Sequence, residues 1–105
     1  MEFRELKSFS EKIDKIATTD DFAFLQVELI EHPEKGVLIR GAGGARKIRM
    51  RIGGKGKSGG ARVIYYYQIS NSVILFIHAF AKNEKANISD KEKKDIAAFI
   101  RRIKA

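Results

Sequence analysis

Four basic side chains have residue types and spacings that suit chemistry on a phosphate group. They are Lys55, Lys57, Arg62 and Lys82. Arginine can bind two phosphate oxygens at once, and a lysine that has lost its proton can act as a base. Such groups suit the cleavage of RNA by its own 2′-hydroxyl, which needs a base, an acid and positive charge around the reacting phosphorus.

A lysine can act as the base only if its pKa is far below the ordinary value. At an ordinary pKa of about 10.4, roughly one lysine in 2,500 is neutral at pH 7. Neighbouring positive charges lower a lysine pKa, and each unit of lowering costs about 1.36 kcal/mol. We therefore expect Lys55, Lys57 and Arg62 to lie close together, with one of the two lysines serving as base or as phosphate clamp.

The composition excludes several other kinds of catalytic site. The chain has no cysteine, which excludes thiol nucleophiles, disulfide scaffolds and cysteine zinc sites. It has two histidines, and the basic group includes neither a carboxylate pair nor a metal-ligand spacing. We therefore expect chemistry that uses no metal ion and no cofactor.

His78 is a further candidate, because it could donate a proton near neutral pH. It lies in an apolar segment, at alternate positions with Phe76 and Phe80. The simpler interpretation is a buried or half-buried histidine, on the same strand face as these two rings, that forms a hydrogen bond. Both interpretations stay open at the level of the sequence.

The glycine-rich residues 54–59 match the pattern G-x-G-x-x-G. A dinucleotide site needs a helix after this pattern, so that the helix start can bind the pyrophosphate. The residues that follow are typical of a strand instead. The segment is therefore interpreted as a cationic hairpin turn, in which glycine allows close approach to a polyanion.

The charge distribution indicates a polyanionic partner. The formal net charge is +8, and residues 35–83 contain ten lysines and arginines without a single carboxylate. Such a segment repels itself unless an anion binds to it, and RNA or DNA phosphate is the most common such anion. Outside the catalytic group, the candidate RNA-binding residues are Arg46, Lys47, Arg49, Arg51 and Tyr66, the last as a ring on which a base could stack.

Hydrophobic spacing predicts helices in the first third of the chain and at its end. One helix is expected over residues 9–17 and a second over 21–31, with Phe22, Leu25, Leu29 and Ile30 facing inward. Phe3 and Leu6 share the spacing of the first helix, but residues 2–6 could instead form a short edge strand. Ser89 and Glu92 form a capping-box pattern before a last helix, whose inward face is expected to hold Ile96, Ala97, Phe99, Ile100 and Ile103.

Three strands are expected between these helices. Residues 46–52 alternate between basic and apolar side chains, and residues 63–69 are mostly β-branched and aromatic. Residues 73–80 are apolar at nearly every position, as in a strand covered on both faces. Residues 34–44 are expected to be a linker. The fold class is therefore α+β, a small, mostly antiparallel three-strand meander with two helices before it and one after it.

The meander brings the candidate catalytic residues together. In antiparallel neighbours, the start of one strand lies beside the end of the next. Arg62 precedes the second strand and Lys82 follows the third. We therefore expect both residues at the same end of the sheet, next to the glycine-rich turn.

The chain length favours a single domain over residues 1–105. The longest apolar run, residues 73–77, is far shorter than a membrane span, and the first six residues are too charged for a secretory signal. We expect a cytoplasmic protein that has no membrane partner.

Three segments together resemble the RelE/HigB superfamily of bacterial toxins, and most closely its HigB-like branch. They are Gly-Gly-Ala-Arg-Lys-Ile-Arg at residues 43–49, Lys-Gly-Lys-Ser-Gly-Gly-Ala-Arg-Val-Ile-Tyr-Tyr at 55–66, and Ala-Lys-Asn-Glu at 81–84. The combination is specific, although each piece alone is weak. The resemblance covers essentially the whole chain.

The resemblance implies the toxin of a type II toxin–antitoxin pair, which cleaves messenger RNA in the ribosomal decoding site and is silenced by a cognate antitoxin. It implies a RelE-like fold, and it places the family's basic positions at Lys55, Lys57, Arg62 and Lys82. The expected partners are thus mRNA on the ribosome, ribosomal RNA and an antitoxin protein. Some members carry a tyrosine after the last basic position, whereas residues 83–105 contain none.

Two other functions remain compatible with the same residues. A non-catalytic module could bind nucleic acid through the same basic surface. The superfamily also includes relatives that inhibit DNA gyrase and lack ribonuclease activity, so the fold alone does not define the chemistry.

Overall fold

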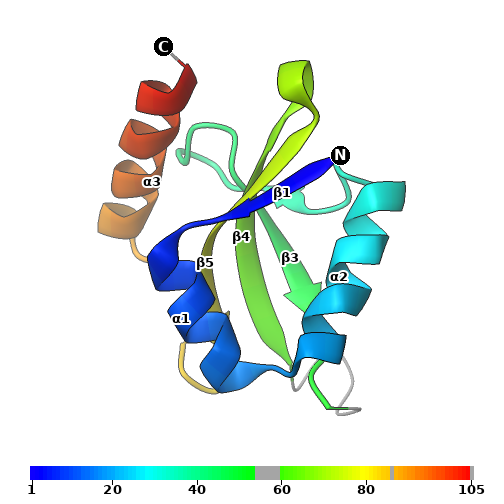
Figure 1. The fold of residues 1–105 in the computed structure, drawn as a ribbon. Helices are drawn as coiled ribbons and strands as arrows, with labels where there is room; N and C mark the ends of the chain where they lie inside the picture. The colour runs from blue at the N-terminus through cyan, green and yellow to red at the C-terminus, as the bar shows by residue number, and fades with distance from the viewer. Residues whose placement is uncertain (54–59, 86, 105) are drawn as a thin grey trace.

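The computed structural model describes residues 1–53, 60–85 and 87–104, and Figure 1 shows how their helices and strands are arranged. Among these residues, no helix is long and apolar enough to cross a membrane. In chain order the elements are β1 (Glu2–Glu5), α1 (Lys7–Ile16), α2 (Thr19–Glu31), β2 (Val37–Leu38), β3 (Arg46–Met50), β4 (Ala61–Gln68), a 3-10 turn (Ile69–Asn71), β5 (Val73–Ala81) and α3 (Asp90–Lys104).

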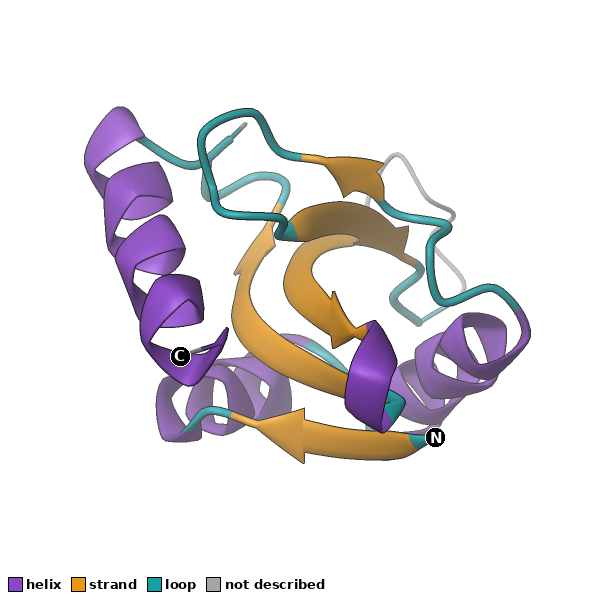
Figure 2. Cartoon of the chain, turned by 90° about the horizontal axis from the view of Figure 1, so that it is seen from above, coloured by secondary structure: helices purple, strands orange, loops and turns teal. Residues whose placement is uncertain are grey.

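The strands form one mixed sheet in the order β1-β5-β4-β3-β2. The pairs β2–β3, β3–β4 and β4–β5 are antiparallel, and β1 runs parallel to β5. Figure 2 shows how strongly the sheet curves. The predicted α+β class, the antiparallel meander and the extra amino-terminal strand are all confirmed. The nearly continuous apolar run of β5 is explained by its central position, because helices cover both of its faces.

Each face of the sheet has its own hydrophobic core. On one face, Phe9 of α1 and Leu25 of α2 pack with Phe76 of β5, and all three are almost fully buried. On the other face, Ile100 of α3 packs with Phe80. The side chains of β3 and β4 therefore divide between a face covered by α1 and α2 and a face that α3 covers, which we call the α3 face.

A β-bulge changes which face the residues of β5 occupy. Ile64 pairs with His78, but the next residue of β4, Tyr65, pairs with Phe76, so Ile77 is the extra residue. The inserted residue reverses the alternation of side chains along the strand. Phe76 consequently belongs to the core under α1 and α2, whereas Phe80 belongs to the α3 face. The expectation that His78 shares a face with both rings is thus wrong for Phe76.

Three further expectations need correction. Ile30 of α2 is 53% exposed and Ile103 of α3 is 37% exposed, so neither faces inward. Each helix contacts the sheet through only a narrow strip of its surface, and Ile30 and Ile103 lie outside that strip. The expected linker 34–44 also contains β2, which pairs with β3 at the sheet edge.

The helix starts follow from capping. Thr18 and Asp21 form a capping box at the start of α2, since the Thr18 hydroxyl accepts the Asp21 N–H and the Asp21 carboxylate accepts the Thr18 N–H. At the start of α3, the predicted box is confirmed by the same two bonds between Ser89 and Glu92, of 2.8 and 3.1 Å.

Candidate phosphate-binding site

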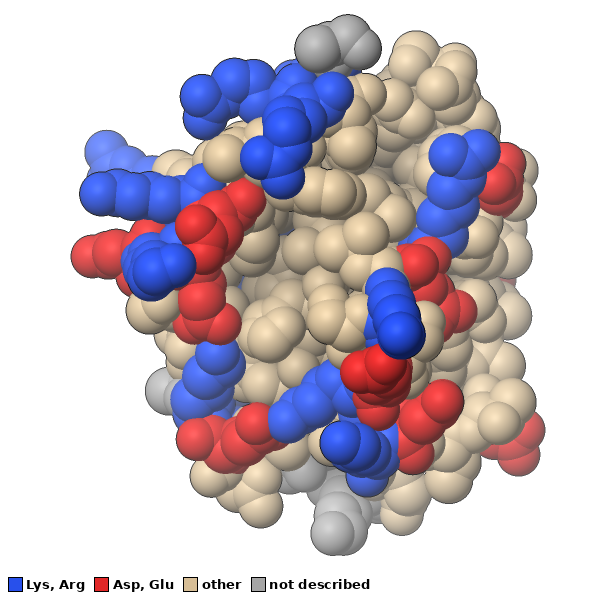
Figure 3. Space-filling model, turned by 60° about the vertical axis from the view of Figure 1, so that its left-hand side comes forward, with Lys and Arg blue, Asp and Glu red and all other residues tan. Residues whose placement is uncertain are grey.

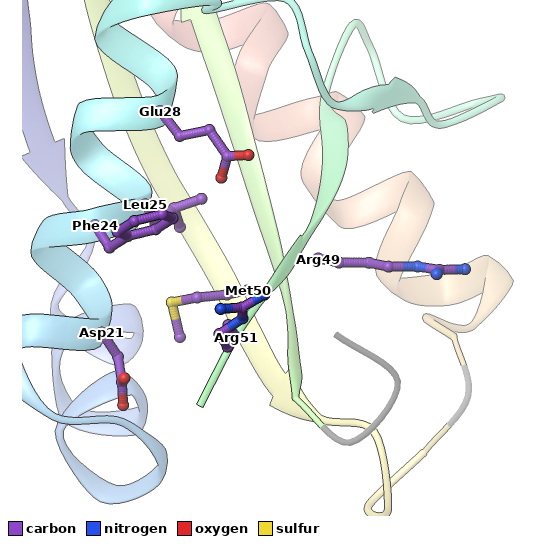
Figure 4. Close-up of a pocket in the computed structure, with 7 residues that line it drawn as sticks. All are labelled: Asp21, Phe24, Leu25, Glu28, Arg49, Met50 and Arg51. Carbon is purple, nitrogen blue, oxygen red and sulfur yellow. The ribbon is translucent and has the colours of Figure 1, made fainter. Parts of the chain in front are cut away.

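The centre of the candidate site is a pair of arginines on neighbouring strands. The β3–β4 register places Arg49 directly opposite Arg62 and Lys47 opposite Ile64. Directly opposite residues point to the same face of a sheet. Since Ile64 belongs to the core under α3, these three basic residues lie on the α3 face. Figure 4 shows the Arg49 side chain pointing away from α2, whereas Met50 points toward it.

Arg62 is a nearly buried cation, with 9% of its surface exposed. Its Nη1 donates a 3.3 Å hydrogen bond to the carbonyl of Ala61, and no carboxylate of the described residues lies within ion-pairing distance. Burial, and then the charge of Arg49, lower the pKa of Arg62. A shielded guanidinium without a counter-ion is costly, and an anion that binds to it would remove that cost.

Lys82 lies at the same end of the sheet as Arg62, as predicted. Its N–H donates a 3.1 Å hydrogen bond to the carbonyl of Gly60, two residues before Arg62. A Cβ at Gly60 would lie 2.1 Å from the Met50 carbonyl oxygen, so only glycine allows the ends of β3 and β4 to approach this closely. The glycine-rich turn with Lys55 and Lys57 lies outside the described residues, and the closeness of these lysines to Arg62 remains a prediction.

The four other basic candidates do not all share this face. Lys47 lies on it and donates a 3.3 Å hydrogen bond to the Asn87 side chain. Arg46 instead stabilises the backbone before β2, because its Nη1 donates hydrogen bonds to the carbonyls of Glu34 and Gly36. Arg51 follows the end of β3 and lines a cavity of about 230 Å³ beside Asp21 of α2 (Figure 4). The structure therefore brings Lys47 and Arg49 to Arg62 but gives Arg46 a structural contact.

The three consecutive tyrosines divide between the two faces. Tyr65 is fully buried, donates a 2.8 Å hydrogen bond to the Pro33 carbonyl and accepts one of 2.9 Å from the Gly36 N–H, while burial raises its pKa. Tyr67 packs partly buried against the core under α1 and α2. Tyr66 lies half-buried on the α3 face beside Gly44, where a Cβ would lie 3.4 Å from its ring. Only Tyr66 is thus placed on the face of Arg62, and its stacking role stays a prediction.

His78 lies in the packing between β5 and α3. Its Nε2 is shielded from solvent, 3.4 Å from Glu92 Oε2, at an angle that forms no hydrogen bond. Burial, followed by the charge of Lys85, lowers the pKa of His78. The half-buried location agrees with the simpler interpretation, although Nε2 forms no hydrogen bond with the described residues. Because this nitrogen is shielded from solvent, we leave His78 out of the proposed reaction.

Sequence reasoning missed Lys85 and the second role of Glu92. Lys85 Nζ lies 2.7 Å from Glu92 Oε2 and 5.2 Å from the centre of the Phe80 ring. The Lys85 ion pair, and then the Ser89 N–H, lower the pKa of Glu92 to about 2. The capping pattern indicated Glu92 only as a cap, because the ion pair depends on where Lys85 lies after the end of β5.

A second depression between α1 and α3 has a different character. It measures about 390 Å³, with Leu6, Ile77 and Phe99 among its lining residues, and Glu92 and Asp95 beside them. Figure 3 shows an uncharged hollow with acidic and basic side chains around its rim. Across the described part of the chain, no three histidine, aspartate or glutamate side chains are grouped to bind a metal ion. A nearly buried cation with no carboxylate partner among the described residues is the feature that distinguishes the Arg49–Arg62 site.

Comparison with solved structures shows the same fold in bacterial toxins. A double mutant of the Escherichia coli toxin RelE in the free state matches with a TM-score of 0.63 and 20% identity, over 93% of this chain and 94% of that chain. The isolated E. coli RelE toxin gives a TM-score of 0.59 and 20% identity, over 93% and 97%. A chain of the intact E. coli RelBE toxin–antitoxin complex gives 0.59 and 21%, over 74% and 92%.

A family model provides the evidence at the level of sequence. The model described as the RelE toxin of the RelE/RelB toxin–antitoxin system matches residues 7–104. The predicted superfamily is thereby confirmed, whereas the HigB-like branch remains a prediction. Taken with the shared fold, this match over nearly the whole chain shows that the protein belongs to the RelE family of toxins from toxin–antitoxin systems.

Proposed function

We propose that this toxin cleaves messenger RNA on the ribosome, without a catalytic metal, by attack of the RNA 2′-hydroxyl on the adjacent phosphate. One observation carries the proposal: Arg62 is nearly buried, lies opposite Arg49 and has no carboxylate partner among the described residues. Such a site is prepared for an anion that gains negative charge during the reaction. Membership of the RelE family supports the same activity.

In the proposed reaction, the 2′-oxygen forms a bond to phosphorus and the bond from phosphorus to the 5′-oxygen breaks. Arg62 stabilises the charge on the five-coordinate phosphorus, and Arg49 and Lys82 hold the phosphate oxygens. Lys55 or Lys57 removes the 2′-hydroxyl proton or acts as a further clamp. The departing 5′-oxygen takes up a proton from solvent, which balances the proton lost by the 2′-hydroxyl, so the products are a 2′,3′-cyclic phosphate and a free 5′-hydroxyl.

The proposal includes two kinds of partner. Ribosomal RNA and mRNA phosphates would bind Lys47, Arg49 and Arg51. A cognate antitoxin would silence the toxin, as the toxin–antitoxin complex of the E. coli relative suggests. The cytoplasm is the compartment in which both kinds of partner are found.

Primer extension on translating ribosomes tests this function. Wild-type protein should generate new mRNA 5′ ends, Arg62→Ala should generate none, and Arg4→Ala, which removes a positive charge from exposed β1, should behave as wild type. RNA binding without new 5′ ends in the wild type would favour the non-catalytic module. Double-strand DNA breaks without mRNA cleavage would favour a gyrase inhibitor.

A further inference from the structure

A second basic hollow lies where the loop after β2 meets the last turns of α3. It measures about 460 Å³ and is lined by Gly43, Ala97, Ile100, Arg101 and Lys104. Figure 1 shows this loop reaching toward the carboxyl-terminal half of α3. A Cβ at Gly43 would lie 3.0 Å from the Ala97 Cα, so the loop backbone is in direct contact with the helix. None of these residues belongs to the Arg49–Arg62 site.

The loop backbone has N–H groups available for an anion. Gly41, Gly43 and Gly44 all have positive φ angles, of 80°, 71° and 104°. The N–H groups of Ala42 and Ala45 donate within the loop, but those of Gly43 and Gly44 donate to no acceptor among the described residues. Both glycines are exposed. Turns that contain left-handed residues often direct successive N–H groups at a bound anion.

The side chains at the hollow add positive charge without compensation. The three carboxylates of α3 lie in its first half and are already paired, Asp90 with Lys93, Glu92 with Lys85 and Asp95 with Lys91. In the described chain, no carboxylate lies within ion-pairing distance of Arg101 or Lys104. Figure 3 shows lysine and arginine side chains gathered at the top of the molecule, the end at which α3 finishes in Figure 1.

Basic residues at the end of a helix also interact favourably with the helix dipole. That effect needs only a positive charge near the last turn. Arg102 supplies such a charge without lining the hollow, and its guanidinium lies 5.9 Å from the Phe99 ring. Arg101 and Lys104 differ from Arg102 because they lie on one side of the helix, three residues apart, and line the hollow together with Gly43. The two positive charges and the exposed backbone of Gly43 therefore meet at one place.

We propose that the N–H groups of Gly43 and Gly44, with Arg101 and Lys104, bind a phosphate of an RNA backbone at a second position, away from the bond that is cut. The inference rests on the proposed function, which makes RNA the polyanionic partner. Gly44 lies beside Tyr66, since a Cβ at this glycine would be 3.4 Å from the ring. Tyr66 is four residues from Arg62 along β4, or about 13 Å at ~3.3 Å per residue. One RNA strand could thus pass from Arg62 over Tyr66 to the hollow.

Two charge-matched double variants test the site. Arg101→Gln with Lys104→Gln removes two charges that line the hollow, and Lys94→Gln with Arg102→Gln removes two charges of the same helix that do not line it. Amide chemical shifts in ¹⁵N-labelled protein are followed during titration with inorganic phosphate and with a short single-stranded RNA. The Gly43 and Gly44 amides should shift with both probes in wild type and in the second variant, but not in the first.

Binding to 70S ribosomes gives the second readout. Loss of one phosphate contact to single-stranded RNA should reduce the slope of log affinity against log salt by about 0.7, and only in the Arg101/Lys104 variant. Cleavage by saturating toxin should stay unchanged in the Lys94/Arg102 control variant. Equal losses in both double variants, or glycine amides that respond to phosphate but not to RNA, would overturn the proposal.

The two hypotheses fail in different ways. If wild-type protein does not cleave mRNA, the proposed function is wrong, and the RNA titration still decides whether the hollow binds a backbone phosphate. If cleavage depends on Arg62 while the glycine amides stay unchanged in RNA, the function stands and the second site does not exist.

Discussion

Arg49 and Arg62 lie directly opposite each other on β3 and β4, on the face covered by α3. Like charges in such positions destabilise a sheet. No carboxylate of the described residues lies within ion-pairing distance of either guanidinium. The toxin thus keeps an unfavourable contact in its free state that a bound phosphate would make favourable, and this arrangement leads to the first prediction.

Replacing Arg49 should stabilise the free protein and weaken RNA binding. Arg49→Gln removes the charge that opposes Arg62, so the free energy of unfolding should rise by about 0.5 kcal/mol. Urea unfolding and ribosome-binding assays measure the two effects. Lys47→Gln is the matched control, because Lys47 lies on the same strand and face but opposite the uncharged Ile64. The account is contradicted if the two variants have the same stability.

Arg62→Lys should separate charge from geometry. Lysine keeps the positive charge but cannot bind two phosphate oxygens with a planar guanidinium. We expect single-turnover mRNA cleavage on ribosomes to fall on the order of 100-fold, while ribosome affinity changes only a few-fold. A cleavage rate near that of wild type would mean that Arg62 contributes only general positive charge.

Gly60→Ala should disrupt the start of β4. The new Cβ would lie 2.1 Å from the Met50 carbonyl oxygen, so the two strands would have to separate, and unfolding experiments should show a loss of about 3 kcal/mol. Gly53→Ala serves for comparison, because a Cβ at Gly53 would have no atom within 4 Å. This variant should lose only about 1 kcal/mol of unfolding free energy, the cost of a positive φ in alanine. Similar losses in both variants would argue against the close approach.

Glu92 should make stability depend on pH in the acidic range. Its ion pair with Lys85 and the Ser89 N–H lower its pKa from 4.5 to about 2 in the folded state. The folded protein therefore favours the charged form, and this stabilisation is complete above about pH 4.5 and disappears as the pH falls through about 2. Because the pair is one-third exposed, we expect an effect of about 1 kcal/mol at most.

The comparison variant is Glu92→Gln, which retains an acceptor for the Ser89 N–H but loses the charge. Unfolding free energies measured by urea titration at several pH values should differ between wild type and variant near neutral pH and converge toward pH 2. A difference that does not change with pH would indicate that the ion pair adds nothing to stability.

Much of the fold could be predicted from local patterns. The apolar run of β5 indicated a central strand, and the Ser89 and Glu92 pair marked the start of α3. The bulge at Ile77 could not be predicted, because it depends on how β4 and β5 pair and has no signature of its own. The exposure of Ile30 likewise depends on where the sheet ends beside α2.

The site could be predicted in part. The antiparallel rule correctly placed Arg62 and Lys82 at one end of the sheet. Composition alone could not distinguish a basic residue that is available to an anion from one that forms hydrogen bonds with the backbone. Arg46 is of the second kind, because it donates to two carbonyls. Knowledge of which strand residues are buried separates the two, because Arg46 and Arg49 lie on opposite faces of β3.

The central claim is that the basic site cleaves RNA through its own 2′-hydroxyl. The most direct measurement uses an mRNA with a single 2′-deoxy nucleotide on the 5′ side of the phosphate that is cut, bound to programmed ribosomes with wild-type toxin. The account predicts that the all-ribose mRNA is cut to a 2′,3′-cyclic phosphate and that the deoxy-substituted mRNA stays intact at that position. Cleavage of both mRNAs at equal rates would contradict it, because water would then be the attacking group.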